Sequence, residues 1–382
     1  MKAGQVLKTQ DSAMEKGRLN ENLPAHKGKI EYLNIVRIIA LFLILYAHLV
    51  CVACFNPNIP AVFSSDALLP VINKATTNIW LFDTWMGNLF HTACGPIGVV
   101  LFLWLSGYLA TISHPKYTAG EFIKRRIIRL WPGLIISLTL VTAVLTLING
   151  LHVGLWQYLF NILLLHSFVR VPVISTVIWV LMVEMLCYFV LACVKEINIK
   201  SMIGINCITM LMLFFQINTG NTSLQVLNYF MRFVPLMLVG CAIQKYGLKS
   251  IKTLFMGVWA YSILYMSIVY IFKFDKLYRN IGTYLVPLFI WIVAYIICKK
   301  IHVTKFEIID KIKNMLVNIS YIVYLIHVPV GLTIMYHLRG LLPSLLNIFV
   351  STGMVLCIAA LLHYYVEKPI SGYLNRKFLA KE

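Results

Sequence analysis

Apolar stretches of membrane-spanning length follow one another along the chain after its first 30 residues. A transmembrane helix needs about 20 predominantly apolar residues to cross roughly 30 Å of hydrocarbon. Ten stretches approach or reach this length, near 33–54, 95–113, 130–148, 175–194, 201–217, 229–244, 253–272, 281–298, 315–338 and 343–366. We therefore predict an all-α integral membrane protein with about ten transmembrane helices, which form one membrane domain over residues 31–368.

One further apolar run, 155–168, is shorter and is interrupted by Gln157, Asn161 and His166. A run of about 14 residues with polar interruptions is typical of a re-entrant or interfacial helix rather than of a transmembrane helix. We predict that it does not cross the membrane.

The composition agrees with this pattern and excludes a water-soluble protein. Apolar residues make up 60% of the chain and charged residues 12%, with a mean hydropathy of +0.82. Lys and Arg number 33 against 14 Asp and Glu, and most of the basic residues fall on one side if both termini are cytoplasmic. The charge excess therefore indicates membrane orientation, not nucleic-acid binding. Residues 1–30 read as a disordered basic cytoplasmic tail and 369–382 as a short cytoplasmic tail.

Ionisable residues inside the predicted helices are candidates for function because each is costly in hydrocarbon. Arg37 and His48 are eleven residues apart, which corresponds to about 20° of rotation and about 16 Å of depth on one helix. Arg37 can extend to the cytoplasmic headgroups while His48 packs in the helix bundle. Alternatively, both line a vertical channel, with Arg37 near an acyl donor and His48 where a proton must move.

Two other predicted helices carry polar residues on one face. Glu184 and Tyr188 are four residues apart, after Trp179, and Ser320, Tyr324 and His327 form a narrow polar stripe. Hydrogen bonding between helices explains such a stripe as well as a functional site does. The depths of His48, Glu184 and His327 predict that one cavity gathers them.

A basic segment at 121–132, which we interpret as a solvated inner loop, contains Lys124, Arg125, Arg126 and Arg129. Guanidinium groups bind phosphate through paired hydrogen bonds. The same charges are also what the positive-inside rule requires of a short cytoplasmic loop.

Taken in order, several short motifs resemble those of the acyltransferase 3 family of integral membrane acyltransferases, from about residue 32 to residue 377. They are NIVR at 34–37 followed after ten residues by His48, LFLWLSGY at 101–108, FIKRRIIRLWP at 122–132, WVLMVE at 179–184, SYIVYLIHVP at 320–329 and YVEKP at 365–369. The resemblance implies transfer of an acyl group, usually acetyl from cytoplasmic acetyl-CoA, to a hydroxyl of a glycan. It makes Arg37 and His48 an essential pair and gives Arg126 and Arg129 a second functional motif. Val100 and Met185 stand where the family usually has acidic residues.

We therefore expect a membrane O-acyltransferase of a bacterial inner membrane that acts on a cell-envelope glycan or lipid-linked saccharide, without a fused extracytoplasmic hydrolase-like domain. Acetyl-CoA is its expected co-substrate, with no permanently bound cofactor and no metal; its expected partners are the acyl-CoA, the saccharide and membrane lipids. The expected catalytic residues are His48, Arg37 and Glu184; Arg125, Arg126 and Arg129 are expected to bind the donor; and Ser106, Tyr108, Trp179, Tyr188, Tyr324 and His327 are expected to line the cavity. The alternatives are a glycan transporter or flippase and a non-catalytic partner in polysaccharide assembly.

Overall fold

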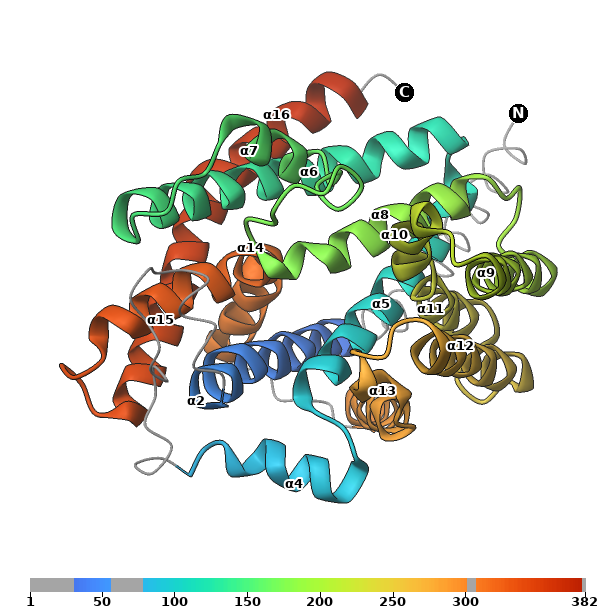
Figure 1. Cartoon of the computed structure of the whole chain (residues 1–382), viewed down its shortest axis with the longest axis horizontal. Helices are drawn as coiled ribbons and strands as arrows, with labels where there is room; N and C mark the ends of the chain where they lie inside the picture. Colours follow the sequence, from blue (N-terminus) through green and yellow to red (C-terminus); the bar gives the residue numbers. More distant parts are fainter. Residues whose placement is uncertain (1–30, 56–77, 301–306, 380–382) are drawn as a thin grey trace, which may run out of the picture.

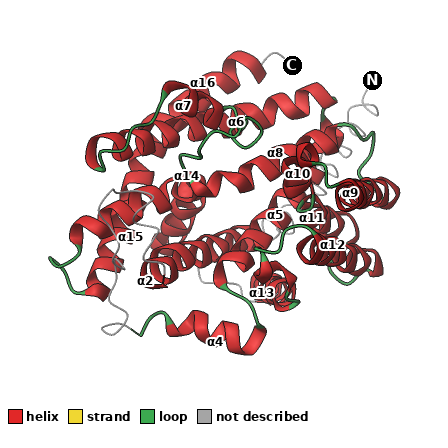
Figure 2. Cartoon of the chain, in the orientation of Figure 1, coloured by secondary structure: helices red, strands yellow, loops and turns green. Residues whose placement is uncertain are grey.

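The computed structural model describes residues 31–55, 78–300 and 307–379, and within these ranges the secondary structure is helical, without a strand (Figure 2). The predicted disordered tail at 1–30 lies outside the described residues. Besides the first helix, Glu31–Val52, the helices are α2 (Ala53–Phe55), α4 (Leu81–Phe90), α5 (Cys94–Ser113), α6 (Ala119–Ala143), α7 (Leu155–Ile162), α8 (Trp179–Ala192), α9 (Ile199–Thr219), α10 (Thr222–Met231), α11 (Val234–Tyr246), α12 (Ile251–Tyr270), α13 (Gly282–Lys300), α14 (Glu307–Leu338), α15 (Ser344–Leu362) and α16 (Lys368–Leu379).

Short segments of other helical types connect or extend these helices. Three are π-helices, in which each N–H bonds the carbonyl five residues back instead of four: η1 (Ala47–Val52), η4 (Val144–Ile148) and η7 (His363–Glu367). The remainder are 3₁₀ turns, η3 (His114–Lys116), η5 (Thr176–Ile178) and η6 (Lys276–Arg279).

Each of the ten predicted apolar stretches coincides with a helix or a helix pair. In the described part of the chain, eight helices are long and apolar enough to cross a membrane, and Thr176–Ala192 and Gly282–Cys298 are shorter apolar helices. An all-α membrane protein is confirmed. The count of ten crossings and the cytoplasmic position of both termini stay predictions.

The run 155–168, which we predicted not to cross the membrane, contains α7, whose eight residues extend only about 12 Å. Asn161 at its end is fully buried, and its side chain bonds the Pro172 carbonyl at 3.0 Å and the Ile174 N–H at 2.9 Å. The polar interruption seen in the sequence therefore fastens the following loop to α7, which packs on α6 (Figure 1).

Helices α5 and α11 pack against each other with their backbones in close contact. A Cβ added to Gly107 would lie 1.9 Å from the Met237 carbonyl oxygen, and one added to Gly240 would lie 2.0 Å from the Trp104 oxygen. Small residues at a helix contact let two backbones approach in this way. The pair holds α5, which carries Ser106, in a fixed position at the centre of the molecule.

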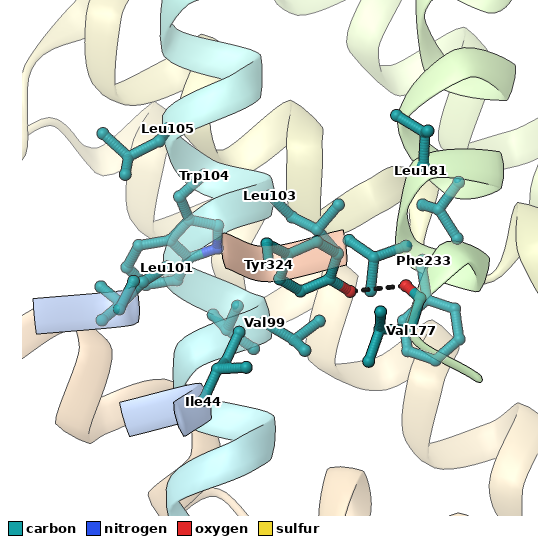
Figure 3. Close-up of a cluster of buried hydrophobic side chains, with 14 of the residues drawn as sticks. Ile44, Val99, Leu101, Leu103, Trp104, Leu105, Val177, Leu181, Phe233 and Tyr324 are labelled. Carbon is teal, nitrogen blue, oxygen red and sulfur yellow. Dashed lines mark hydrogen bonds between the residues drawn. The ribbon is translucent and has the colours of Figure 1, made fainter. Parts of the chain in front are cut away.

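Helix α14 is held at several depths by hydrogen bonds to neighbouring segments. The Tyr324 hydroxyl donates to the Val177 carbonyl at 2.7 Å, as Figure 3 shows within a cluster of buried apolar side chains. The Ser175 hydroxyl donates to the Leu325 carbonyl, and the Tyr321 hydroxyl donates to the Leu130 carbonyl at 2.9 Å. These bonds tie α14 to the start of α8 and to α6, the helices that surround the candidate site.

The interpretation of 121–132 as a loop is wrong, because α6 begins at Ala119 and includes this whole segment. Thr118 and Glu121 form a capping box, in which each side chain bonds the backbone N–H of the other. A Thr three residues before a Glu signals a helix start, and the basic residues that follow are therefore ordered on a helix.

The C-terminal segment is also helical, since α15 continues through η7 into α16. Residues 369–379 of the predicted short tail belong to α16, which lies beside α6 (Figure 1). The side chain of Lys124 on α6 donates to the Phe378 carbonyl on α16 at 2.9 Å. The ends of α6 and α16 thus form one basic surface.

Candidate active site

A cavity of about 270 Å³ lies between the first helix, α5, α6, α8, α14 and η7. Its polar lining combines charged and hydroxyl groups from all six segments. They are Arg37, Ser106, Arg129, Glu184, Tyr188, Asn318, Ser320, Tyr321, Tyr324, His363 and Glu367. Five of the expected catalytic or cavity residues, from four separate helices, meet here: Arg37, Ser106, Glu184, Tyr188 and Tyr324.

Glu184 is fixed in the cavity wall by two donors. Its Oε1 accepts a hydrogen bond from the Ser106 hydroxyl at 2.8 Å and another from the Tyr188 hydroxyl at 2.5 Å. A carboxylate inside the membrane domain needs such partners, because an unpaired one is expensive to bury. The spacing of Glu184 and Tyr188 on α8 indicated this contact, whereas Ser106 on α5 could be paired with Glu184 only in three dimensions.

Arg37 and Arg129 supply two positive charges to the same cavity. No hydrogen bond or ion pair among the described residues involves either guanidinium group. Both therefore keep their donors available for a ligand, and a planar guanidinium suits the oxygens of a phosphate or a carbonyl.

Arg126 takes a different position from Arg129, although both belong to the same basic motif. Its side chain is buried, donates to the Ser113 hydroxyl, and stacks on the Tyr188 ring at 4.7 Å from the ring centroid. Arg126 thus stands behind the cavity wall and supports the tyrosine that binds Glu184. The expectation that it lies on a solvated segment is wrong, because α6 turns this side chain into the helix bundle.

His48 and His327 form a second polar group, on the first helix and α14. The Nδ1 of His48 lies 3.0 Å from the Ile44 carbonyl oxygen and 3.1 Å from His327 Nε2, while His327 Nδ1 lies 2.8 Å from the Tyr324 oxygen. Because carbonyl oxygens only accept, Nδ1 of each ring carries the hydrogen. In the neutral pair, His48 Nε2 is left with its lone pair, and it has no hydrogen-bond partner within the described ranges.

The backbone around His48 departs from regular α-helical geometry, because the histidine lies in the π-helix η1. Such segments often occur at functional sites, where they place a side chain that a regular helix would direct elsewhere. The contact with α14 is close: a Cβ added to Gly331 would lie 2.6 Å from a methyl group of Leu49. A glycine at position 331 therefore permits η1 to approach α14.

The structure places His48, Glu184 and His327 in two groups rather than in one cavity. Glu184 lines the 270 Å³ cavity together with Arg37, while neither histidine is part of its lining. Tyr324 links the groups, since it lines the cavity and its ring centroid lies 5.9 Å from that of His327. The stripe of Ser320, Tyr324 and His327 on α14 thus runs from one group to the other.

Two expected cavity residues lie elsewhere. Tyr108 packs edge-on against Tyr32 and beside Trp291, in an aromatic cluster next to α13. Trp179 packs on Phe233, with ring centroids 5.0 Å apart, at the turn between α10 and α11. Neither side chain lines the cavity, and both pack against aromatic neighbours instead.

Four polar residues of the cavity were missed in the sequence, Asn318, Tyr321, His363 and Glu367, and the last two form a pair. His363 and Glu367 lie four residues apart, and His363 Nδ1 is 2.5 Å from Glu367 Oε2. The predicted last transmembrane stretch ended at 366, so Glu367 lay within the predicted membrane domain but just beyond its last apolar stretch. Their i, i+4 spacing was the signal that could have identified them.

A second cavity, of about 710 Å³, lies where α6 and α16 meet. Four cationic residues and one carboxylate contribute to its lining, Lys124, Arg125, Arg376, Lys377 and Glu121. The Arg125 guanidinium also lies 4.0 Å from the centroid of the Tyr117 ring, which fixes its orientation. An excess of cations around a cavity favours binding of an anion. In the described part of the chain no three His, Cys, Asp or Glu side chains gather as metal ligands do.

Comparison with protein families agrees with the motifs and the helical membrane fold. Residues 30–364 match the acyltransferase domain that defines the acyltransferase 3 family. The chain belongs to the acyltransferase 3 family. No curated protein and no solved structure matches the chain. The match covers the cavity lining except Glu367, and it includes His48 and His327.

Proposed function

We propose that this protein is a bacterial inner-membrane O-acyltransferase. It moves an acyl group, acetyl in the leading case, from cytoplasmic acyl-CoA to a hydroxyl of a cell-envelope glycan or lipid-linked saccharide. Membership in the acyltransferase 3 family supports acyl transfer in a membrane. The observation that carries the proposal is the cavity in which Arg37 and Arg129 face a hydrogen-bonded Glu184.

The positions of the cations support acyl-CoA as the donor. The second cavity, with Lys124 and Arg125, lies about 7.5 Å along α6 from Arg129, because the helix rises 1.5 Å per residue. Coenzyme A carries its phosphates at one end and its thioester at the other, joined by the pantetheine arm. With the phosphates in the second cavity and the thioester near Arg129, the pantetheine arm would run along α6 in a folded conformation.

The cavity charges suit the chemistry of the acyl carbon. When a nucleophile attacks a thioester, negative charge develops on the carbonyl oxygen, and donors already in place stabilise it. Arg37 and Arg129 are the groups available for this role. His48 is the proposed base or transient acyl carrier, since its Nε2 lone pair is the form needed for either role.

Acetyl-CoA consumption by the purified protein in liposomes tests the proposal. With an envelope glycan or lipid-linked saccharide fraction as acceptor, the wild-type protein should release free CoA thiol, and Arg37→Gln should release it at least 100-fold more slowly. Arg339→Gln is the matched control, because Arg339 is exposed and stacks on Tyr336 far from the cavity lining. Mass spectrometry of the acceptor then identifies the acylated saccharide.

Two results would contradict the proposal. Movement of the saccharide across the liposome membrane with acetyl-CoA left intact would favour the transporter or flippase alternative. Neither transfer nor transport, with envelope polysaccharide assembly still dependent on the protein in cells, would favour a non-catalytic partner.

A further inference from the structure

His363 and Glu367 form a carboxylate–imidazole pair at the boundary of the cavity that contains Arg37 and Glu184. The two residues bracket the π-helix η7, and both line the cavity. Their side chains are only 15% and 12% exposed, so the pair is sheltered but accessible from the cavity. Gly133 of α6 makes room next to the pair for Tyr321, because an added Cβ would lie 2.7 Å from that ring, and it borders Glu367 at ordinary contact distance.

The geometry fixes which nitrogen of His363 is available for chemistry. Nδ1 lies 2.5 Å from Glu367 Oε2, so an ionised Glu367 holds the hydrogen on Nδ1. The other nitrogen, Nε2, has no hydrogen-bond partner among the residues that the structure describes. A carboxylate that orients an imidazole and stabilises its protonated form is a common arrangement in general acid–base catalysis.

The position of this pair differs from that of His48 and His327. His363 lines the cavity with Arg37, Arg129 and Glu184, whereas His48 and His327 do not. Of the histidines in the described ranges, His363 is therefore the one next to the groups that would polarise a thioester.

We propose that His363 is a second catalytic residue, which transfers a proton to the sulfur of the departing CoA, and that Glu367 is its positioning residue. This role rests on the proposed acyl transfer. In this half of the reaction a bond forms between the nucleophile and the acyl carbon, and the proton that the nucleophile loses goes to His363 Nε2; His48 then serves as the acyl carrier or as the base for the later transfer to the saccharide. The carbon–sulfur bond breaks with its electron pair on sulfur, and the proton on Nε2 moves to the thiolate. The products are the acylated nucleophile and free CoA thiol, and His363 returns to its neutral state.

Steady-state kinetics of His363→Gln test the role of the imidazole. Glutamine keeps a hydrogen-bonding side chain but cannot take up a proton near neutral pH. General acid–base catalysis contributes about 10²- to 10⁴-fold. We expect kcat to fall at least 100-fold while the KM for acetyl-CoA changes less than about twofold. His152→Gln, at an exposed histidine outside the cavity, should keep wild-type kinetics.

Chemical rescue separates proton transfer from a structural role. His363→Ala leaves a space in the cavity, and imidazole added to the buffer should restore at least a tenth of wild-type activity. Glu367→Gln should lower kcat about tenfold with little change in KM. Added imidazole should not restore the activity of this variant, because the His363 side chain is still present and has lost only the carboxylate that orients it.

The outcomes distinguish this role from the proposed function. An active wild-type protein whose kcat is unchanged by His363→Gln would overturn the role of His363 alone. Loss of activity without rescue of His363→Ala would also overturn it, in favour of a structural role. A wild-type protein that transfers no acyl group would contradict the proposed function and this role with it.

Discussion

His48 illustrates how a single side chain can be tested against the structure. Its Nδ1 is used by Ile44 and His327, so only Nε2 can accept a proton or an acyl group. We expect both His48→Gln and His48→Ala to lose at least 100-fold in acyl transfer while the protein still inserts into the membrane, because removing a polar group from hydrocarbon does not oppose insertion. Acetyl transfer by membranes that contain equal amounts of each variant is the measurement.

Activity close to wild type in His48→Gln would exclude proton transfer by this residue. Ser262→Ala is a suitable control, because that hydroxyl bonds only its own helix, at the Val258 carbonyl.

Arg126 and Arg129 should respond differently to the same substitution, although they belong to one motif. Arg129→Ala removes an exposed cation from the cavity and should raise the KM for acetyl-CoA about 10- to 100-fold, the effect of losing one charged hydrogen bond of about 1.5–3 kcal/mol. It should also lower kcat, because Arg129 is proposed to stabilise the charge that develops on the acyl oxygen. Thermal unfolding should change little. Arg126→Ala leaves Ser113 and Tyr188 without their buried partner, so it should lower the unfolding temperature and kcat together.

Kinetic and thermal measurements on both variants check this difference. Equal effects of the two substitutions on KM, with unchanged stability, would mean that Arg126 also contacts the donor.

The close packing between α5 and α11 predicts where a small substitution is most harmful. Gly240→Ala would place a Cβ 2.0 Å from the Trp104 carbonyl oxygen, so α5 and α11 would have to separate. We expect at least about 1–3 kcal/mol of destabilisation, the usual cost of overpacking. Gly257→Ala is the matched control: it lies in α12 with open space around its Cβ and should be neutral or slightly stabilising. Unfolding temperatures of the purified variants in detergent give the comparison.

An undiminished unfolding temperature for Gly240→Ala would show that the two helices are farther apart than the structure places them.

Helix positions could be predicted from the sequence because long apolar runs have few alternatives to a buried or membrane-spanning helix. The exact ends could not: α6 was placed eleven residues late because the charges at 121–129 outweighed the capping box. The helix pair α10 and α11 was taken as one stretch beginning at 229, although a helical segment already starts at Thr222. Hydropathy measures apolar content, and helix ends depend on capping and on local hydrogen bonds.

The candidate site was only partly predictable for a related reason. Glu184 and Tyr188 share a helix face, so their contact follows from spacing. Contacts between helices far apart in the chain do not, which is why Arg126 was expected on a solvated segment and Glu367 was not recognised as a cavity residue. Polar residues in a membrane protein can be recognised singly from the sequence, but their grouping requires the helix packing.

For the whole molecule, the strongest remaining prediction concerns topology. Asn221, between α9 and α10, should lie on the outer side if the N-terminus is cytoplasmic, because most of the basic residues then face inward. We expect a cysteine at Asn221 to react with a membrane-impermeant reagent from outside intact cells. A cysteine at Lys249 should react only after the cells are opened. Exposed native cysteines are first replaced by serine, at Cys193, Cys207 and Cys357.

Labelling of the Asn221 position only from the cytoplasmic side would reverse the proposed orientation of the donor and acceptor sides.

The π-helix η1 has a consequence for how this region can change in evolution. A π-helical turn contains one residue more than an α-helical turn, so deletion of one residue there would restore α-helical winding. The residues on one side of the deletion would then be rotated by about 100° about the helix axis relative to the residues on the other side, since an α-helix has 3.6 residues per turn. A deletion between Arg37 and His48 would turn Arg37 away from the cavity that it lines while His48 stayed against His327. We therefore expect insertions and deletions between these two residues to be tolerated less well than most substitutions.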